Sequence, residues 1–518
     1  MSTPTTEIDL RHTRGLTGDP GEPRRGSAGR WWALAVLMMP VLLVSIDNTV
    51  LNFALPAISE ATQPTGTQLL WMVDIYPLVL AGLLVSMGSL GDRIGRRKLL
   101  LIGSAGFGVV SVIAAFAPSI EGLIMARAAL GFFGAMLMPS TLSLLRSIFT
   151  DRNERRLAIA VWATGFAAGS ALGPLVGGIL LEHFAWGSVF LIAVPLLLPL
   201  LICAPLLVPE SKDPHPGRID PLSIALSLVT MLPIVYGIKA IAENGPDLAA
   251  VAPIAVGLVF GALFVRRQKR LASPMLDMTL FQRGAFSGAV GVNLLAVTAL
   301  VGCLFFISQH LQLVLGMSPL NAGLVLVPGL AAMIAAGLLI VPIAKRVRPS
   351  IVVPLALTVS ASGFALIALS GGQIDAAGLA LAFVLLGVGI GAAETVSNEL
   401  IVASAPAEKA GAASAVSETA YELGAVLGTA ILGSILTAAY RTNVVLPDGL
   451  SPAQQLSASE TLGGAVTVSN QLSADAGAQL LDSARLAFDS GVGVSAWIGV
   501  ALVVTAALVG ALALRRAR

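Results

Sequence analysis

The chain has 518 residues, of which 56% are hydrophobic and only 12% are charged, with a formal net charge of +2. This composition excludes a water-soluble globular protein and is typical of a chain that crosses a membrane several times. The two cysteines, Cys203 and Cys303, lie in apolar stretches without the spacing of metal ligands, so we expect both to be small core residues.

The first 30 residues are polar, rich in proline and glycine, and without the apolar core or cleavage site of a signal peptide. We expect residues 1–30 to form a disordered cytoplasmic tail. Fourteen apolar stretches follow, each long enough to supply the roughly 20 residues that a membrane-spanning helix needs. They are centred near residues 42, 79, 108, 133, 168, 198, 230, 257, 300, 331, 360, 389, 424 and 503. The sequence thus predicts an all-α membrane protein with 14 transmembrane helices.

Lysine and arginine gather in every second connection between these stretches. The main clusters are Arg93, Arg96, Arg97 and Lys98; Arg152, Arg155 and Arg156; Arg266, Arg267, Lys269 and Arg270; and Lys345, Arg346 and Arg348. With both tails and the remaining connections of that side, they hold 27 of the 31 basic residues, whereas loops of the other side hold only Lys239, Arg441 and Arg485. The positive-inside rule therefore predicts that both termini are cytoplasmic.

Several acidic residues lie inside the apolar stretches. They are Asp47, Asp74, Glu394, Glu418 and Glu422. A carboxylate near the middle of a membrane helix costs roughly 2.5 to 3.5 kcal/mol on insertion scales, so such residues usually bind, pair or move charge. The sequence therefore favours a transporter.

The helices are expected to divide into groups of six, two and six. We predict an N-terminal six-helix bundle at 31–210, an inserted helix pair at 211–272 and a C-terminal six-helix bundle at 273–518. The inserted pair carries no convincing acid, so we expect it to stand apart from the transport pathway. The last bundle includes a long polar loop at about 440–490, which topology places outside the cell, and its tract 474–488 is expected to form an amphipathic surface helix.

The connection between the second and third stretches reads Gly88-Ser-Leu-Gly-Asp92-Arg93-Ile-Gly95-Arg96-Arg97-Lys98. It closely resembles the signature loop of the major facilitator superfamily, with the glycines, the acid and the basic triplet in the expected places. An ordinary basic loop that satisfies the positive-inside rule would explain the arginines but neither the glycines nor the acid. The resemblance implies the major facilitator fold.

Two further segments resemble helices of the same family. Leu123 to Gly134 resembles its fourth helix with a buried arginine, here Arg127. Gly169 to Gly178 resembles the fifth-helix motif typical of drug exporters. Small residues four apart recur wherever membrane helices pack closely, but the embedded pair Gly173-Pro174 is more specific, because proline removes a backbone hydrogen bond and glycine tolerates the bend.

Other stretches resemble the fourteen-helix drug:proton antiporter branch of the family, and within it the quaternary ammonium exporters of the QacA type. These stretches are Asp47 to Pro56, Trp71 to Tyr76, Pro205 to Ser211, Pro274 to Asp277 and Ala415 to Gly424. The resemblance implies a monomer in the plasma membrane of a prokaryote, without a cofactor or metal. It also implies that conformational change is controlled by Gly88, Asp92, Arg93, Gly95, Arg96, Arg127, Gly173 and Pro174.

In the first bundle, Asp47 and Arg127 are expected at similar depth in the first and fourth helices. They form either a static ion pair or one that depends on protonation of Asp47 and helps to open or close the outer half. Asp74 follows Trp71 near the outer end of the second helix. The aromatic surroundings fit a plain interface anchor, whereas the resemblance favours proton coupling or cation attraction in the outer vestibule.

In the second bundle, Glu418 and Glu422 are four residues apart and so share one helix face. Two carboxylates this close in a low dielectric cannot both ionise cheaply, so one is expected to hold a proton that a bound cation would expel. The resemblance implies that Glu418 serves both substrate and proton. The proton-coupling candidates are therefore Asp47, Asp74, Glu418 and Glu422.

The chain departs from the QacA pattern at several positions. Met333 stands where that exporter has an aspartate associated with dications, and Ser417 stands where a second acid of the thirteenth span, centred near residue 424, would be. Glu394 is extra and is expected to replace the missing charge, whereas Glu399 is either solvated or functional. Monocations are therefore expected rather than dications. The candidate substrate contacts are Glu418, Glu394, Tyr421, Phe306 and Met333.

The expected function is proton-coupled efflux of hydrophobic cations such as quaternary ammonium compounds, cationic dyes and antiseptics, with no nucleic-acid partner. The sequence contains no HExxH, GxSxG, GxGD or nucleotide-binding P-loop, which argues against an enzyme and an ATP-driven pump. Nutrient uptake is disfavoured by the fifth-helix motif. Export of an endogenous metabolite or self-made antibiotic stays open, because such an exporter would look the same at this level.

Overall fold

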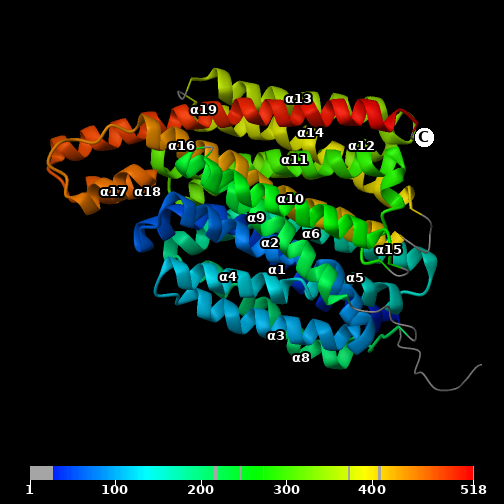
Figure 1. Ribbon diagram of the computed structural model, residues 1–518. Coiled ribbons are helices and arrows are strands. Elements are labelled where there is room, and N and C mark those ends of the chain that lie inside the picture. The colour runs from blue at the N-terminus through cyan, green and yellow to red at the C-terminus, as the bar shows by residue number, and fades with distance from the viewer. Residues whose placement is uncertain are drawn as a thin grey trace, which may run out of the picture.

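The computed structural model describes residues 27–213, 220–245, 247–271, 274–371, 374–405 and 410–516. Within these ranges all regular secondary structure is helical. Among the described residues, fourteen spans are long and apolar enough to cross a membrane, and Figure 1 shows them as one elongated bundle. The predicted all-α fold with 14 transmembrane helices is therefore confirmed. Nearly all of the expected tail at 1–30 lies outside the described residues.

The first six spans include two broken helices, and some of their helix starts are capped by a side chain. They are α1 (Ser27–Thr62), α2 (Gly66–Ile94), α3 (Arg96–Ala115), α4 with α5 (Ile120–Gly134 and Leu137–Ile148), α6 (Arg152–His183), and α7 with α8 (Ser188–Leu191 and Ala193–Leu207). Thr65 forms a capping box with Gln68 at the start of α2, and the Asp151 side chain accepts hydrogen bonds from two backbone amides at the start of α6. These caps satisfy amide groups that have no partner within the helix.

The fifth-helix motif brings α6 against helices of both halves. A Cβ atom on Gly173 would lie 1.8 Å from Thr49 Oγ1 of α1, and one on Gly178 would lie 2.6 Å from Leu320 Cα of α12. Only glycine permits these approaches, which is the role that small residues play in packed membrane helices. Pro174 lies within α6, which continues through it.

The last six spans form the second half, and two of them contain a π-helical turn. They are α11 with η2 (Gly284–Gln309 and His310–Val314), α12 (Pro319–Ala344), α13 (Pro349–Leu369), α14 (Ala376–Ala403), α15 with η4 and α16 (Ala410–Gly428, Thr429–Gly433 and Ser434–Asn443), and α19 (Ala474–Ala513). Short 3-10 turns, η1 (Leu280–Gln282) and η5 (Leu514–Arg516), flank them. The structure corrects the expectation of a surface helix at 474–488. These residues are helical, but they form the first part of the 40-residue α19, which continues directly into the last span.

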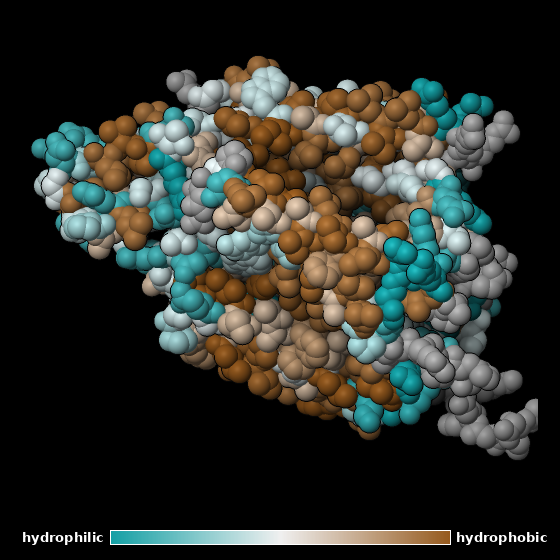
Figure 2. Space-filling view, in the orientation of Figure 1, coloured by the Kyte–Doolittle hydropathy of each residue, from teal (hydrophilic) through white to brown (hydrophobic). Residues whose placement is uncertain are grey.

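The inserted pair, α9 (Pro221–Asn244) and α10 (Leu248–Gln268), forms a hairpin on the side of the bundle. α9 packs against α2 of the first half and against η4 and α16 of the second, whereas α10 packs against α9. Large apolar side chains of α10, including Leu258 and Val259, are exposed. Figure 2 shows hydrophobic residues across the middle of this face and hydrophilic ones toward the ends, as expected where lipid covers the middle.

The long loop forms two short helices, α17 (Pro452–Glu460) and α18 (Leu462–Ser469), which project beyond the spans with the start of α19 (Figure 1). Glu460 pairs with Arg441 of α16, and its Oε2 accepts a hydrogen bond from the backbone amide of Gly66 at 2.9 Å. Since Gly66 begins α2, this loop ties the two halves together at its end of the bundle.

Candidate functional site

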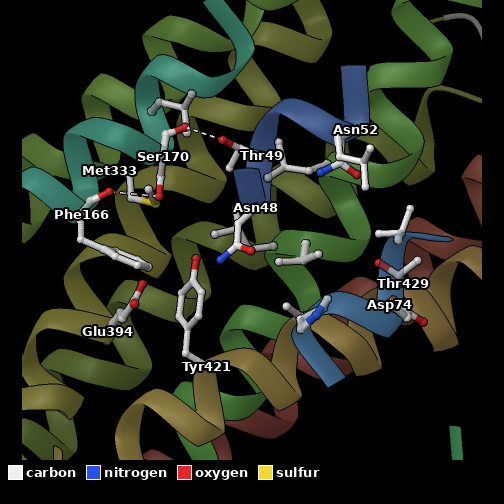
Figure 3. A pocket seen from close by; sticks show the side chains of 18 of the residues that line it. Asn48, Thr49, Asn52, Asp74, Phe166, Ser170, Met333, Glu394, Tyr421 and Thr429 are labelled. Carbon is white, nitrogen blue, oxygen red and sulfur yellow. Dashed lines mark hydrogen bonds between the residues drawn. The ribbon is translucent and has the colours of Figure 1, made fainter. Parts of the chain in front are cut away.

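A cavity of about 110 Å³ lies between the two halves in the middle of the bundle. Its walls come from α1, α2, α4 and α6 on one side and from α11, α12, α14, α15 and η4 on the other. The polar lining residues, many of them labelled in Figure 3, are Asn48, Thr49, Asn52, Asp74, Arg127, Ser170, Glu394, Tyr421 and Thr429. A largely apolar cavity with a few convergent polar groups is the usual form of a small-molecule site.

Asp47 and Arg127 meet in the wall of this cavity, as the sequence predicts. Arg127 Nη1 lies 2.7 Å from Asp47 Oδ2, and the two side chains are only 2% and 7% exposed. The guanidinium also lies 4.4 Å from the centre of the Tyr76 ring, and its Nε donates to the Met72 carbonyl at 3.4 Å. The ion pair with Asp47, the cation–π contact with Tyr76 and the hydrogen bond to the Met72 carbonyl together offset the free-energy cost of burying the arginine.

Asp74 is paired with a cation that the sequence analysis misplaced. Lys239, which was counted among loop residues, belongs to α9 and is 1% exposed. Its Nζ lies 2.9 Å from Asp74 Oδ2 and 4.0 Å from the centre of the Trp71 ring. Asp74 is fully buried and lines the cavity, so it does not lie in an outer vestibule. The hydropathy pattern placed the end of this span before Lys239, so the lysine was assigned to a loop although it lies inside α9.

Three glutamates of the second half have no such partners among the described residues. None of the ion pairs among the described residues includes Glu394, Glu418 or Glu422. Glu394 lines the cavity beside Met333, where it was expected to replace a missing charge. Glu418 and Glu422 lie next to the cavity on α15 without being part of its lining. Glu422 is fully buried and accepts one hydrogen bond, of 3.5 Å, from Asn48 of α1.

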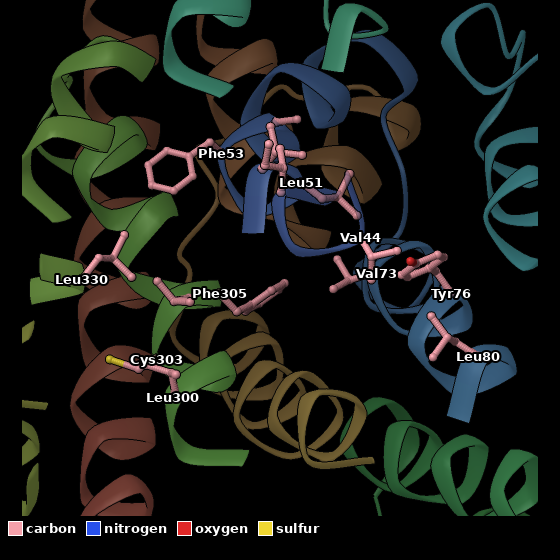
Figure 4. Packing of buried hydrophobic residues seen from close by; sticks show 14 of the residues in the cluster. Val44, Leu51, Phe53, Val73, Tyr76, Leu80, Leu300, Cys303, Phe305 and Leu330 are labelled. Atoms are coloured by element: carbon pink, nitrogen blue, oxygen red, sulfur yellow. The ribbon is translucent and has the colours of Figure 1, made fainter. Parts of the chain in front are cut away.

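The aromatic candidates separate into two groups. Tyr421 lines the cavity and packs edge-to-face against Phe166 of α6, with ring centres 5.6 Å apart, so the pair joins the two halves. Phe306 is 1% exposed and is not part of the lining. Its neighbour Phe305 belongs to the apolar cluster around the cavity, shown in Figure 4, that includes Leu51, Val73, Leu300 and Leu330.

The signature loop is held within the first half. Gly95 has φ of +111°, which favours glycine, and a Cβ there would meet the Glu210 carboxylate at 2.7 Å. Glu210 accepts hydrogen bonds from the backbone amides of Arg97 and Lys98, and Arg96 Nε donates to Asp92 Oδ1 at 2.9 Å. The loop is thus bound to the segment that follows α8. Arg93 is exposed, and Gly88 lies in α2 facing α5.

Several lining residues were missed by the sequence analysis. Asn48, Asn52, Ser170 and Thr429 are neutral and common in membrane helices, so nothing in the sequence set them apart. Lys239 had a usable signal, because it lies in the apolar run Ile234-Val-Tyr-Gly-Ile-Lys239-Ala-Ile241. A lysine inside such a run is as unusual as a buried acid and predicts a buried partner.

Comparison with known proteins identifies the family. The model of the Major Facilitator Superfamily matches residues 37–429. The multidrug efflux pump LfrA of Mycolicibacterium smegmatis is 59% identical, over 97% of this chain and 99% of LfrA. The methyl viologen resistance protein SmvA of Salmonella typhimurium is 38% identical, over 89% of this chain and 93% of SmvA. The tetracenomycin C resistance and export protein of Streptomyces glaucescens is 33% identical, over 82% and 79%.

A solved structure supports the fold. A bacterial homologue of the human lysosomal transporter Spinster matches with a TM-score of 0.67 at 17% identity, covering 94% of this chain and 98% of that one. The family match, the drug-efflux relatives and the fourteen spans agree with one another. The chain therefore belongs to the major facilitator superfamily, in its drug antiporter branch, and is a multi-pass membrane transporter of the drug-efflux type rather than an enzyme.

Proposed function

We propose that the protein exports lipophilic monocations in exchange for protons, with the central cavity as the binding site. The observation that carries the proposal is Glu394, a carboxylate on the cavity wall that has no basic partner among the described residues. Phe166, Tyr421 and Met333 line the same space and offer aromatic and polarisable contacts to an organic cation. A negative charge framed by such groups suits a quaternary ammonium compound or a planar dye.

Exchange follows from competition for the same carboxylates. An unpaired carboxylate in an apolar cavity is costly as a bare anion, so it holds either a proton or a cation. Arrival of the cation expels the proton, and departure of the cation admits another. Glu418 lies close enough to Glu394 to interact with it electrostatically, and Glu422 lies one turn further along α15, so protons can be shared among three acids.

The voltage dependence of transport reports the number of protons that are exchanged for each exported cation. One monocation leaving against one entering proton moves no net charge, so only the pH difference drives it. A second proton adds the membrane potential, worth about 2.3 kcal/mol per 100 mV. The three acids allow either ratio.

In an alternating-access mechanism, the two halves rock against each other around the cavity. We place the end that carries α17 and α18 outside the cell, because basic residues gather at the opposite end. Gly178 against Leu320, and Glu460 against Gly66, then hold the outer side closed in this structure. Outward opening requires both contacts to part.

Ethidium uptake into inverted membrane vesicles, the direction that corresponds to export from the cell, tests the proposal. A pH gradient should drive ethidium transport by the wild type, and an uncoupler should abolish it. Glu394→Gln and Glu418→Gln should each lower coupled transport at least about tenfold, the loss expected when an essential proton carrier is removed. Glu399→Gln is the matched control, because Glu399 lies on the same helix as Glu394 but is exposed.

Two outcomes would contradict the proposal. If the wild type moves neither ethidium nor tetraphenylphosphonium under any gradient, the proposal of cation export is refuted. If Glu394→Gln transports like Glu399→Gln, the cavity carboxylate is not the coupling site. The tetracenomycin C relative favours one alternative, export of a self-made antibiotic. If tetracenomycin C is transported, and Glu394→Gln leaves that transport intact, the alternative is supported.

A further inference from the structure

Asp74 and Trp71 together form a site suited to an organic ammonium ion. A carboxylate supplies the counter-charge, and an indole face supplies cation–π attraction, which is how proteins commonly hold alkylammonium groups. Here the ammonium ion is part of the chain itself: Lys239 Nζ lies 2.9 Å from Asp74 Oδ2 and 4.0 Å from the Trp71 ring centre. Because Asp74 lines the central cavity, this internal cation occupies a position that a substrate charge could otherwise take.

The inserted helix pair holds Lys239 in place. Ser227 of α9 donates a hydrogen bond to the Gly82 carbonyl of α2 at 3.3 Å, and the side chain of Leu228 fills the space beside Gly82. Two turns further along α9, Val235 packs with Leu78 of α2 in an apolar cluster that includes Val426 and Ala430 of the second half. The lysine therefore enters the bundle from a helix that is fixed against both halves.

The ion pairs determine how much charge the cavity offers. The charged residues of its lining are Asp74, Arg127 and Glu394. Arg127 is neutralised by Asp47, and Asp74 is neutralised by Lys239. Glu394 remains the one lining carboxylate without a basic partner among the described residues. A cavity with one available negative charge suits a substrate with one positive charge.

We propose that Lys239 determines charge specificity, because by occupying the Asp74–Trp71 site it restricts the cavity to monocations. The inserted helix pair is then a part of substrate selection. The inference rests on the proposed export of cations and assigns a residue for its charge preference. Figure 3 shows Asp74 and Glu394 on opposite sides of the cavity, with Asn48 and Tyr421 between them. Release of Asp74 would therefore create two separated negative sites, the arrangement that a dication requires.

Ethidium and propidium test this proposal, since both carry the same phenanthridinium ring and propidium adds a second, quaternary ammonium charge. The wild type should move ethidium and discriminate against propidium in inverted vesicles. Lys239→Met, which keeps the length of the side chain and removes its charge, should raise the propidium-to-ethidium ratio by about tenfold, the effect of one added favourable charge contact. Lys239→Arg should keep the wild-type ratio.

The double variant Lys239→Met with Asp74→Asn identifies the source of the gain. It leaves no unpaired charge at the Asp74–Trp71 site and should return the ratio to the wild-type value. If Lys239→Met does not accumulate in the membrane, Lys239→Gln replaces it, because its amide can still donate to Asp74. An unchanged ratio in the single variant, with ethidium efflux intact, would overturn the proposal, and so would an equal gain in the double variant. Failure of the wild type to move ethidium would instead refute cation export itself.

Discussion

The two six-helix halves hold their buried acids in opposite ways. In the first half, Asp47 is paired with Arg127 and Asp74 with Lys239, and both pairs are almost fully buried. In the second half, Glu394, Glu418 and Glu422 form no ion pair with the described residues. We propose that the acids with fixed partners serve as parts of the framework, and that those without basic partners among the described residues exchange protons and cations.

The location of the pairs supports this division. Neither ion pair joins the first half to the second, since Arg127 belongs to α4 and Lys239 to the inserted α9. The contacts across the cavity are weaker: Asn48 donates to Glu422 at 3.5 Å, and Phe166 packs against Tyr421. The halves can therefore move apart around the cavity without separating a buried ion pair, which would be costly.

The largest expected effect is the loss of one member of a buried pair. Arg127→Met should lower the free energy of unfolding by about 3–5 kcal/mol, because Asp47 is left buried without a counter-charge. The thermal midpoint of the purified protein in detergent would measure the loss. Removing the second charge as well, in Arg127→Met with Asp47→Asn, should restore much of the stability. Equal loss in the single and double variants would mean that packing of Arg127 against Tyr76, rather than charge, holds the first half together.

A buried acid without a partner should behave differently. Glu422→Gln keeps the shape of the side chain and its hydrogen bond to Asn48, and removes only the ability of the side chain to ionise. We expect the free energy of unfolding to change by less than about 1 kcal/mol, or to rise, because an amide is less costly to bury than a carboxylate. The same thermal measurement applies. A loss as large as that for Arg127→Met would show that Glu422 is a framework residue, and the contrast between the halves would fail.

The sequence was sufficient for the fold and for part of the site. Fourteen spans follow from apolar length alone, and the meeting of Asp47 and Arg127 follows from their similar depth. The partner of Asp74 could not be found in this way, because a hydropathy window treats a lysine near the end of a stretch as its boundary. The signature loop was recognised from its residues, but its contact with Glu210 joins segments more than 100 residues apart, which no local pattern determines.

The sequence also did not predict which of the acids of the second half lines the cavity. The resemblance implies that Glu418 serves both substrate and proton, yet Glu394 is the acid of the second half that lines the cavity. Which face of a helix is turned inward depends on its packing against all neighbours, and a rotation of about 100° separates adjacent residues. Hydropathy does not fix this rotation for helices such as α14 and α15, which contact other helices on several sides.

The smallest expected effect concerns an ion pair of the same chemistry at the edge of the membrane. Asp220 precedes α9, and its Oδ1 lies 2.9 Å from Nη2 of Arg267 in α10. Both side chains are partly exposed. The hydrogen bond from Arg267 lowers the pKa of Asp220 to about 2. The pair therefore stabilises the fold above the ordinary carboxyl pKa of about 3.9, and this contribution is lost as the pH falls toward 2.

Asp220→Asn isolates this charge, because asparagine can still cap α9 as Asp220 does through Ser223. At pH 7 the variant should lower the thermal midpoint far less than Arg127→Met, since water and salt screen an exposed pair. Between pH 4 and pH 2 the difference from the wild type should shrink toward zero. If the exposed pair matched the buried one at pH 7, burial would not be what separates framework acids from exchangeable ones, and the availability of a partner alone would explain the difference between the halves.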